Sequence, residues 1–221
     1  MTREPGSPRL SLDRRYLAPA LVTLLGGLFT LVVAVHVFPH HSLNDDEGVY
    51  LTQAAMLADG HLFVRPGPLA GLVRPWFFVA AEQAGDLALY SKYTPPTAAF
   101  LAPFVALGVP RLALGLVGAG VAGVTYGLAV RAFDRRTGVV AALLLVGSPL
   151  YLFTTGVFLS YAPATLLNGG FALAYLRATD VGSRRLAAFA GVLAGLAFFT
   201  RPYTAVLFSL PFVCHALLTL Y

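Results

Sequence analysis

The segment YLAPALVTLLGGLFTLVVAVHVF, residues 16–38, contains no Asp, Glu, Lys or Arg, and three consecutive acids, Asp45, Asp46 and Glu47, follow it. A membrane-spanning helix needs about 20 apolar residues, so this segment is long enough to cross a bilayer. The acids would then lie at the membrane surface, where they can accept a proton, bind a cation or simply be solvated. Composition agrees, because 57% of the residues are hydrophobic and only 11% are charged, which is too apolar for an ordinary soluble domain.

Further apolar stretches of suitable length follow, at residues 112–130, 138–158, 160–176, 186–200 and 203–221. The stretch 186–200 is short, but Arg184 and Arg185 before it can extend it by snorkelling. We therefore predict an all-α polytopic membrane protein with about six transmembrane helices. Residues 1–15 form a cytoplasmic tail and residues 16–221 the transmembrane domain, which we expect to be truncated at its C-terminal end because Tyr221 closes an apolar run.

Arginine placement predicts the orientation. Ten of the fifteen basic residues fall on one side of these spans: Arg3, Arg9, Arg14, Arg15, Arg131, Arg135, Arg136, Arg177, Arg184 and Arg185. The positive-inside rule makes that side cytoplasmic, so the N-terminus is cytoplasmic and the loop 39–111 is extracytoplasmic. The sequence thus predicts a multi-pass protein of the cell (plasma) membrane, in contact with membrane lipids. The net charge of +5 follows from this topology and does not indicate nucleic-acid binding.

The loop 39–111 is expected to carry short interfacial helices. Residues 45–58 have good helix formers, with Asn44 as a cap, acids in the first turn and Gly60 beyond the end. The apolar run 98–109 is too short to cross, so we expect a helix at the membrane edge. Trp76, Phe77 and Phe78 suit the headgroup region.

Four short motifs carry a family resemblance, and all fall on the predicted extracytoplasmic side. They are Asp46-Glu47-Gly48-x-Tyr50, Lys92-Tyr93-Thr94-Pro95-Pro96, Ser160-Tyr161-Ala162-Pro163 and Phe199-Thr200-Arg201-Pro202-Tyr203. Together they resemble the membrane glycosyltransferases of the GT-C fold, in particular the branch with protein O-mannosyltransferases and lipid A aminoarabinose transferases (glycosyltransferase family 39-like). The resemblance covers nearly the whole chain and corresponds to the N-terminal part of the family.

The resemblance implies transfer of a sugar from a polyprenyl- or dolichyl-phosphate donor to a protein, lipid or glycan acceptor. In the family, the aspartate that matches Asp46 acts as general base or helps to hold a divalent cation, and the lysine that matches Lys92 contacts the donor phosphate. The aminoarabinose branch has a metal-binding glutamate where this chain has Ser91. A divalent cation is therefore an open alternative, and no metal ligands are assigned.

The chemistry of such a transfer selects the same residues. A carboxylate must take the proton of the incoming nucleophile, and a cation must stabilise the leaving phosphate. Both must lie at headgroup depth, which Asp46 and Lys92 satisfy by their places in the loop. Asp45 and Glu47 are the neighbouring catalytic candidates, and Arg201, in a turn on the same side, is the second candidate for phosphate binding.

Simpler explanations exist for each residue. Acids at a helix N-terminus are favoured by the helix dipole alone, Lys92 can anchor a loop at the interface, and Arg201 can snorkel. Two other functions remain open: a transporter or flippase with Asp45, Asp46 and Arg201 on an ion path, and a non-catalytic membrane subunit or fragment. A transporter is expected to carry ionisable groups within its spans, whereas these spans hold almost none.

Overall fold

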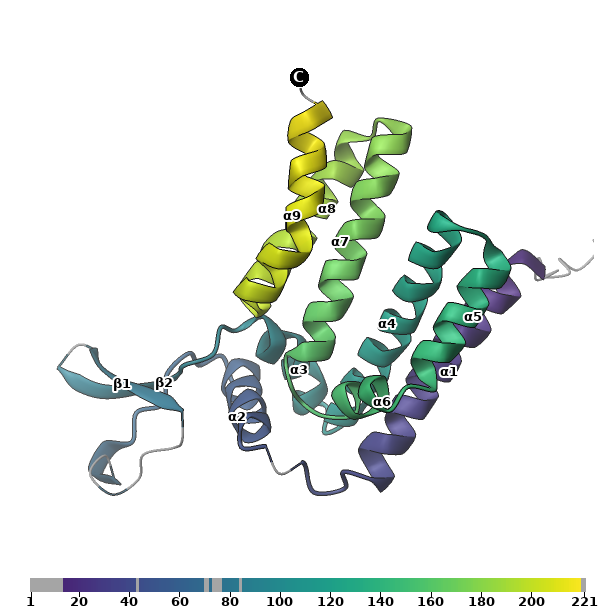
Figure 1. Cartoon of the computed structure of the whole chain (residues 1–221). Coiled ribbons are helices and arrows are strands. Elements are labelled where there is room, and N and C mark those ends of the chain that lie inside the picture. The colour runs from purple at the N-terminus through teal and green to yellow at the C-terminus, as the bar shows by residue number, and fades with distance from the viewer. Residues whose placement is uncertain (1–13, 43, 70–71, 73–76, 84, 220–221) are drawn as a thin grey trace, which may run out of the picture.

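The computed structural model of the protein describes residues 14–42, 44–69, 72, 77–83 and 85–219. The described chain is mostly helical, as predicted (Figure 1). Its elements are α1 Arg14–His36, α2 Asp46–Ala58, a 3-10 turn Gly67–Leu69, β1 Phe78–Gln83, β2 Asp86–Ser91, α3 Pro96–Ala106, α4 Pro110–Ala132, α5 Arg135–Val146, α6 Pro149–Thr155, α7 Tyr161–Val181, α8 Arg184–Thr200 and α9 Pro202–Thr219.

Among the described residues, three helices are long and apolar enough to cross a membrane: α1 over Tyr16–His36, α4 and α9. The pair α5 and α6 would make a fourth crossing, although the two are bent by 68°. The coarser prediction of a helical membrane protein is thus confirmed, whereas six crossings are not shown. Helix α8 has only 17 residues, and α7 carries Arg177 and Asp180 in its last turns.

The predicted span 138–158 is not one continuous helix. Helix α5 ends at Val146, and Ser148 has the extended conformation φ −77°, ψ 127° before Pro149 begins α6. Proline disfavours a helical conformation in the residue before it and has no N–H to continue the ladder, so the helix breaks there. Hydropathy alone does not reveal this break, so the prediction of one continuous span was wrong here.

Small residues allow α1 and α4 to pack closely side by side. A Cβ atom on Gly26 would lie 2.7 Å from the Cβ of Ala122, and one on Gly118 would overlap Thr30. The same region holds a buried polar network, because Thr30 Oγ1 lies 2.9 Å from Thr155 Oγ1 and the Tyr151 hydroxyl donates to the Gly118 carbonyl at 2.8 Å. These bonds tie the short helix α6 to both α1 and α4.

The loop between α1 and α4 forms α2 and α3 as predicted, and also a β-hairpin that was not predicted. Helix α2 ends as expected, with Gly60 at φ +76°. It packs on α3 and buries Val49, Tyr50, Ala54 and Met56, so it is part of the core and not only an interfacial helix. Strands β1 and β2 pair antiparallel with Phe78 opposite Ser91, and Gly85 at φ +83° lies in their turn. Trp76, Arg3 and Arg9, which the sequence analysis named, lie outside the described residues.

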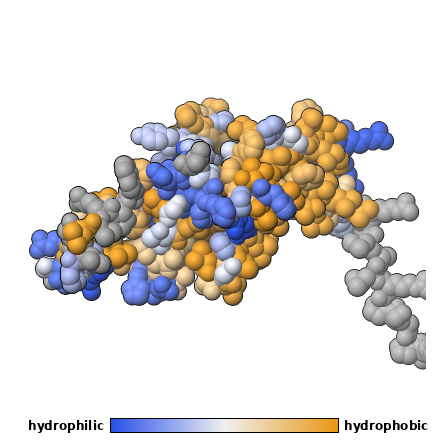
Figure 2. All heavy atoms as spheres, turned by 90° about the horizontal axis from the view of Figure 1, so that it is seen from below, coloured by the Kyte–Doolittle hydropathy of each residue, from blue (hydrophilic) through white to orange (hydrophobic). Residues whose placement is uncertain are grey.

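The elements give the molecule two distinct ends. The hairpin end carries α2, α3, α6 and the β-hairpin, and the arginine end carries the turns between α4 and α5 and between α7 and α8 (Figure 1). At the arginine end Arg131 pairs with Asp180 at 2.5 Å. Seen from below, hydrophilic residues gather in the middle of the face and at the hairpin, and hydrophobic residues cover most of the remaining helical surface (Figure 2). The catalytic candidates all belong to the hairpin end.

Candidate functional site

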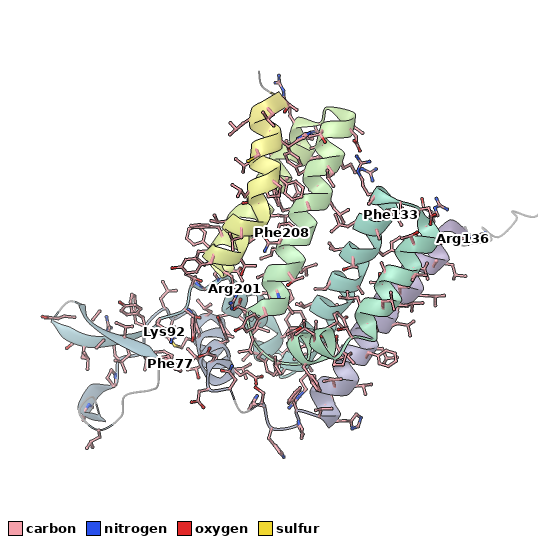
Figure 3. All side chains as sticks on the ribbon, in the orientation of Figure 1. Phe77, Lys92, Phe133, Arg136, Arg201 and Phe208 are labelled. Carbon is pink, nitrogen blue, oxygen red and sulfur yellow. The ribbon has the colours of Figure 1, made fainter. Side chains whose placement is uncertain are left out.

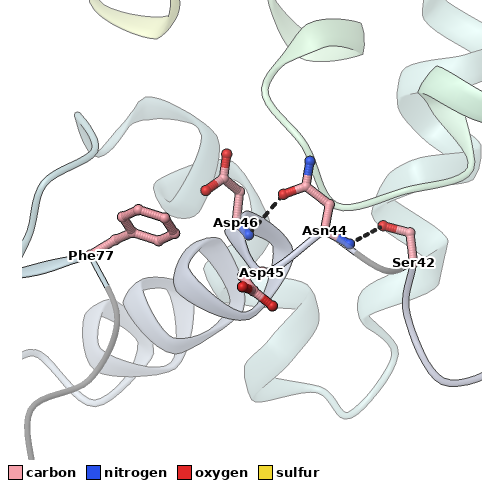
Figure 4. Close-up of a pocket in the computed structure, with 5 residues that line it drawn as sticks. All are labelled: Ser42, Asn44, Asp45, Asp46 and Phe77. Atoms are coloured by element: carbon pink, nitrogen blue, oxygen red, sulfur yellow. Dashed lines mark hydrogen bonds between the residues drawn. The ribbon is translucent and has the colours of Figure 1, made fainter.

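The three consecutive acids at the start of α2 have three different environments. Asp45 is exposed, Asp46 is partly buried, and Glu47 is only 1% exposed. Asp46 begins the helix, and its N–H donates to Asn44 Oδ1 at 3.0 Å. The N-cap residue is Asp45, whose side chain makes no capping bond, so the predicted cap at Asn44 is wrong by one residue. The Asp46 side chain points toward Phe77, whereas Asp45 points to another side of the first turn (Figure 4). Sequence neighbours are therefore not interchangeable here.

Tyr93 connects Asp46 to the segment before α3. Its hydroxyl donates to Asp46 Oδ1 at 2.5 Å, and its ring stacks on Tyr50 with centroids 4.9 Å apart and planes 17° apart. Burial, followed by the hydrogen bond and the charge of Asp46, raises the pKa of Tyr93 above its ordinary value. Tyr93 therefore keeps its proton and remains a hydrogen-bond donor to Asp46.

Lys92 lies against two aromatic rings, those of Phe77 and Tyr93. Its Nζ is 3.4 Å from the ring centroid of Phe77 and 4.8 Å from that of Tyr93. The Lys92 N–H also donates to the Phe77 carbonyl at 3.0 Å. Phe77 has φ +60°, a conformation that is uncommon for a bulky side chain. An ammonium over aromatic faces is held by the ring quadrupoles and still has donors for an anion.

Arg201 reaches the same region from the turn between α8 and α9 (Figure 3). Its Nη1 donates to Ser160 Oγ at 3.2 Å, and its guanidinium carbon lies 4.0 Å from the ring centroid of Tyr161. Thr94, two residues after Lys92, hydrogen-bonds the Phe199 carbonyl and so joins the two cationic segments. A guanidinium held by one hydroxyl and one ring keeps further donors for a ligand.

Lys92 and Arg201 line one cavity of about 290 Å³, which we call the cation cavity. Its other lining residues are Tyr50, Tyr93, Thr94, Ser160, Thr200, Pro202, Tyr203 and Thr204. Burial raises the pKa of Tyr50, against the lowering effect of a hydrogen bond with Ser160, so its hydroxyl also stays protonated. The cavity thus combines two cations with several neutral donors and suits an anionic group.

Two further hollows are linked to this cavity, one by the hydrogen bond between Tyr93 and Asp46 and one by a shared lining residue. Asp46 lines an open depression of about 550 Å³ together with Asp45, Ser42, Asn44 and Phe77, which we call the acidic depression (Figure 4). On another side lies an apolar groove of about 330 Å³, lined by Pro95, Pro96, Thr97, Ala99, Phe100, Val117, Pro163, Leu166, Leu167, Leu196 and Thr200. Thr200 borders both the apolar groove and the cation cavity.

The structure brings the candidates from three segments to the hairpin end. Asp46, Lys92 and Arg201 are connected through Tyr93 and the cation cavity, whereas Asp45 faces solvent and Glu47 is buried. Within the described ranges, no group of three or more His, Cys, Asp or Glu side chains could hold a metal ion. The described residues alone therefore do not offer a divalent cation a full set of such ligands.

Sequence reasoning missed the roles of Tyr93, Tyr50, Ser160 and Phe77. Tyr50 gave no local signal, because its hydroxyl bonds Ser160, which lies far away in the sequence. For Tyr93 a signal existed, since it directly follows the only lysine, in a motif already singled out.

Comparison with known proteins adds no relative, since no family model matches the chain, and no curated protein or solved structure was found to be similar to it. The resemblance to GT-C glycosyltransferases therefore stays a prediction.

Proposed function

We propose that this protein is a membrane glycosyltransferase that moves a sugar from a polyprenyl- or dolichyl-phosphate donor to an acceptor at the extracytoplasmic surface. One observation carries the proposal: a carboxylate, Asp46, is hydrogen-bonded to Tyr93, which lines a cavity with two cations, Lys92 and Arg201. The transfer needs such a base beside such an anion site.

The donor phosphate would bind in the cation cavity. Lys92 contributes a compact charge, and Arg201 contributes a planar group that suits phosphate oxygens. The adjoining apolar groove gives a hydrocarbon chain a place next to the phosphate, through the shared Thr200. A lipid-linked donor fits this pair of hollows better than a free sugar nucleotide, which has no apolar chain.

The acceptor would approach from the acidic depression, where Asp46 is accessible. Asp46 takes the proton of the acceptor hydroxyl or amine while the acceptor atom bonds to the anomeric carbon. The bond from that carbon to the phosphate oxygen breaks, and its electron pair leaves on the phosphate beside Lys92 and Arg201. Tyr93 orients Asp46 by its hydrogen bond, and Asp45 adds negative charge nearby.

This function requires the hairpin end to lie on the extracytoplasmic face of the cell membrane. We propose accordingly that α7 and α8 cross the bilayer in addition to α1, α4, α5 with α6, and α9. Their alternation between the two ends supports this, since α7 runs from the hairpin end to the arginine end and α8 returns (Figure 1). The arginines at the turns then satisfy the positive-inside rule.

Asp46→Asn tests the assignment of the base. The purified protein in lipid vesicles is given polyprenyl-phosphate mannose or aminoarabinose, the donors of the branch it resembles, and sugar release from the donor is measured. We expect a loss of about 100-fold or more in Asp46→Asn with unchanged donor binding. Asp59→Asn is the matched control, because Asp59 is an exposed acid at the other end of α2. Wild-type release in Asp46→Asn contradicts the assignment.

A further inference from the structure

Glu47 is the largest fully buried side chain among those described, although it is an acid in an outer loop. Its two carboxyl oxygens contact different segments. Oε1 accepts from the Ser42 N–H at 2.7 Å and from the Ser42 hydroxyl, and Oε2 accepts from the Phe158 N–H at 2.8 Å. Burial leaves it no contact with either the acidic depression or the cation cavity. Its bonds therefore point to a role other than proton transfer.

The partner Phe158 belongs to the turn between α6 and α7, residues 156–160, which ends at Ser160. Ser160 accepts a hydrogen bond from Arg201, and the next residue, Tyr161, provides the ring over which the guanidinium lies. The position of this turn consequently fixes the position of one cation of the cavity. On the α6 side the turn is already held by the buried hydroxyls of Thr155 and Tyr151.

We infer that Glu47 is a positioning residue that clamps the 156–160 turn to the start of α2 and thereby places Arg201 for phosphate binding. The ligand part of this inference rests on the proposed function. The clamp itself rests on the bonds of Glu47 alone, which join segments 111 residues apart. Asp46 and Glu47 thus have different roles. Asp46 faces the substrate, and Glu47 holds the 156–160 turn beside the cation cavity.

Glu47→Gln tests the clamp directly. The partners of Glu47 are the N–H and hydroxyl of Ser42 and the N–H of Phe158, which all donate to its two oxygens. A glutamine has only one acceptor oxygen, so the N–H of either Ser42 or Phe158 must face its NH₂ group, which is also a donor. We expect amide hydrogen exchange in the 156–160 turn to accelerate by about tenfold, with α7 unchanged, as measured by mass spectrometry on the purified protein. Asp59→Asn is the control. Glu47→Asp, which keeps both oxygens but withdraws them from Phe158, is expected to give a smaller acceleration.

Exchange at wild-type rates in either folded Glu47 variant overturns the clamp. If Glu47→Gln does not fold, Glu47→Asp decides.

A double-mutant cycle tests whether the clamp acts through Arg201. The ligand is undecaprenyl phosphate in detergent micelles, with undecaprenol as the lipid that lacks a phosphate. We expect Glu47→Gln to weaken phosphate-lipid binding about tenfold in the wild-type background and less than about twofold when Arg201→Ala is present. If Glu47→Gln weakens binding by the same factor in both backgrounds, positioning through Arg201 is overturned. A general loss of stability would weaken binding equally whether or not Arg201 is present.

The two hypotheses fail in different ways. If the wild-type protein binds undecaprenyl phosphate no better than undecaprenol, the proposed donor site is wrong. The exchange rates of the 156–160 turn in the Glu47 variants then remain the test of the clamp.

Discussion

At the scale of single residues, Tyr93 joins the acid of the site to its cations, and its protonation predicts a pH dependence. Its pKa is raised from 10.0 by burial first and by Asp46 next. The folded protein therefore holds this proton more tightly than the unfolded chain. The protonated Tyr93 thus contributes fully to the free energy of unfolding below pH 10.0, and this contribution is lost as the pH rises above that value. In Tyr93→Phe we expect the free energy of unfolding to fall less steeply above that pH.

Thermal unfolding in detergent across the alkaline range measures this slope. Tyr203→Phe is the control, since Tyr203 is 88% exposed, and it is expected to keep the wild-type slope. The same slope in Tyr93→Phe as in the wild type contradicts the prediction.

The cations Lys92 and Arg201 carry a second prediction at this scale. Charge-assisted hydrogen bonds to a phosphate are roughly twice as strong as neutral ones, so Lys92→Ala and Arg201→Ala are each expected to weaken undecaprenyl phosphate binding about tenfold or more. Arg65→Ala is the matched control, because Arg65 is an exposed arginine of the same loop and does not line the cation cavity. Unchanged binding in both variants would contradict the proposal that the phosphate binds in the cation cavity.

At the scale of elements, the close packing of α1 and α4 depends on glycine. A Cβ on Gly118 would overlap Thr30, a member of the buried hydroxyl network, whereas one on Gly195 would meet no atom within 4 Å. Overpacking costs about 1–3 kcal/mol, so Gly118→Ala is expected to destabilise the protein by that amount and Gly195→Ala to be neutral. Unfolding in detergent titrations compares the two variants. Equal stabilities would show that α1 and α4 can separate without loss.

Hydropathy and capping predicted the elements that are governed by local sequence. The apolar run of α1 and the C-terminal end of α2 before Gly60 follow from rules that act within a few residues. The break before Pro149 was also local and could have been predicted, since proline rarely continues a helix. The β-hairpin was harder, because its strands are short and Gly85 alone indicates the turn.

At the scale of the whole molecule, the sequence could name candidates but not their distances. Asp46, Lys92 and Arg201 were selected by charge and depth, yet their meeting at Tyr93 and the cation cavity depends on long-range packing. Glu47 shows the same limit, because nothing in a run of three acids indicates which one turns inward.

The orientation of the whole molecule gives the last prediction. Cys214 is the only cysteine, so replacing it with serine allows single cysteines to be placed at either end. Asp59 follows the last residue of α2, at the hairpin end, and Arg136 lies at the arginine end (Figure 3). Both positions are exposed. In intact cells a membrane-impermeant maleimide is expected to label Asp59→Cys, and to label Arg136→Cys only after permeabilisation, because arginine-rich turns stay in the cytoplasm. The reverse pattern would place Asp46 on the cytoplasmic side, where a lipid-phosphate sugar transferred at the outer face could not reach it.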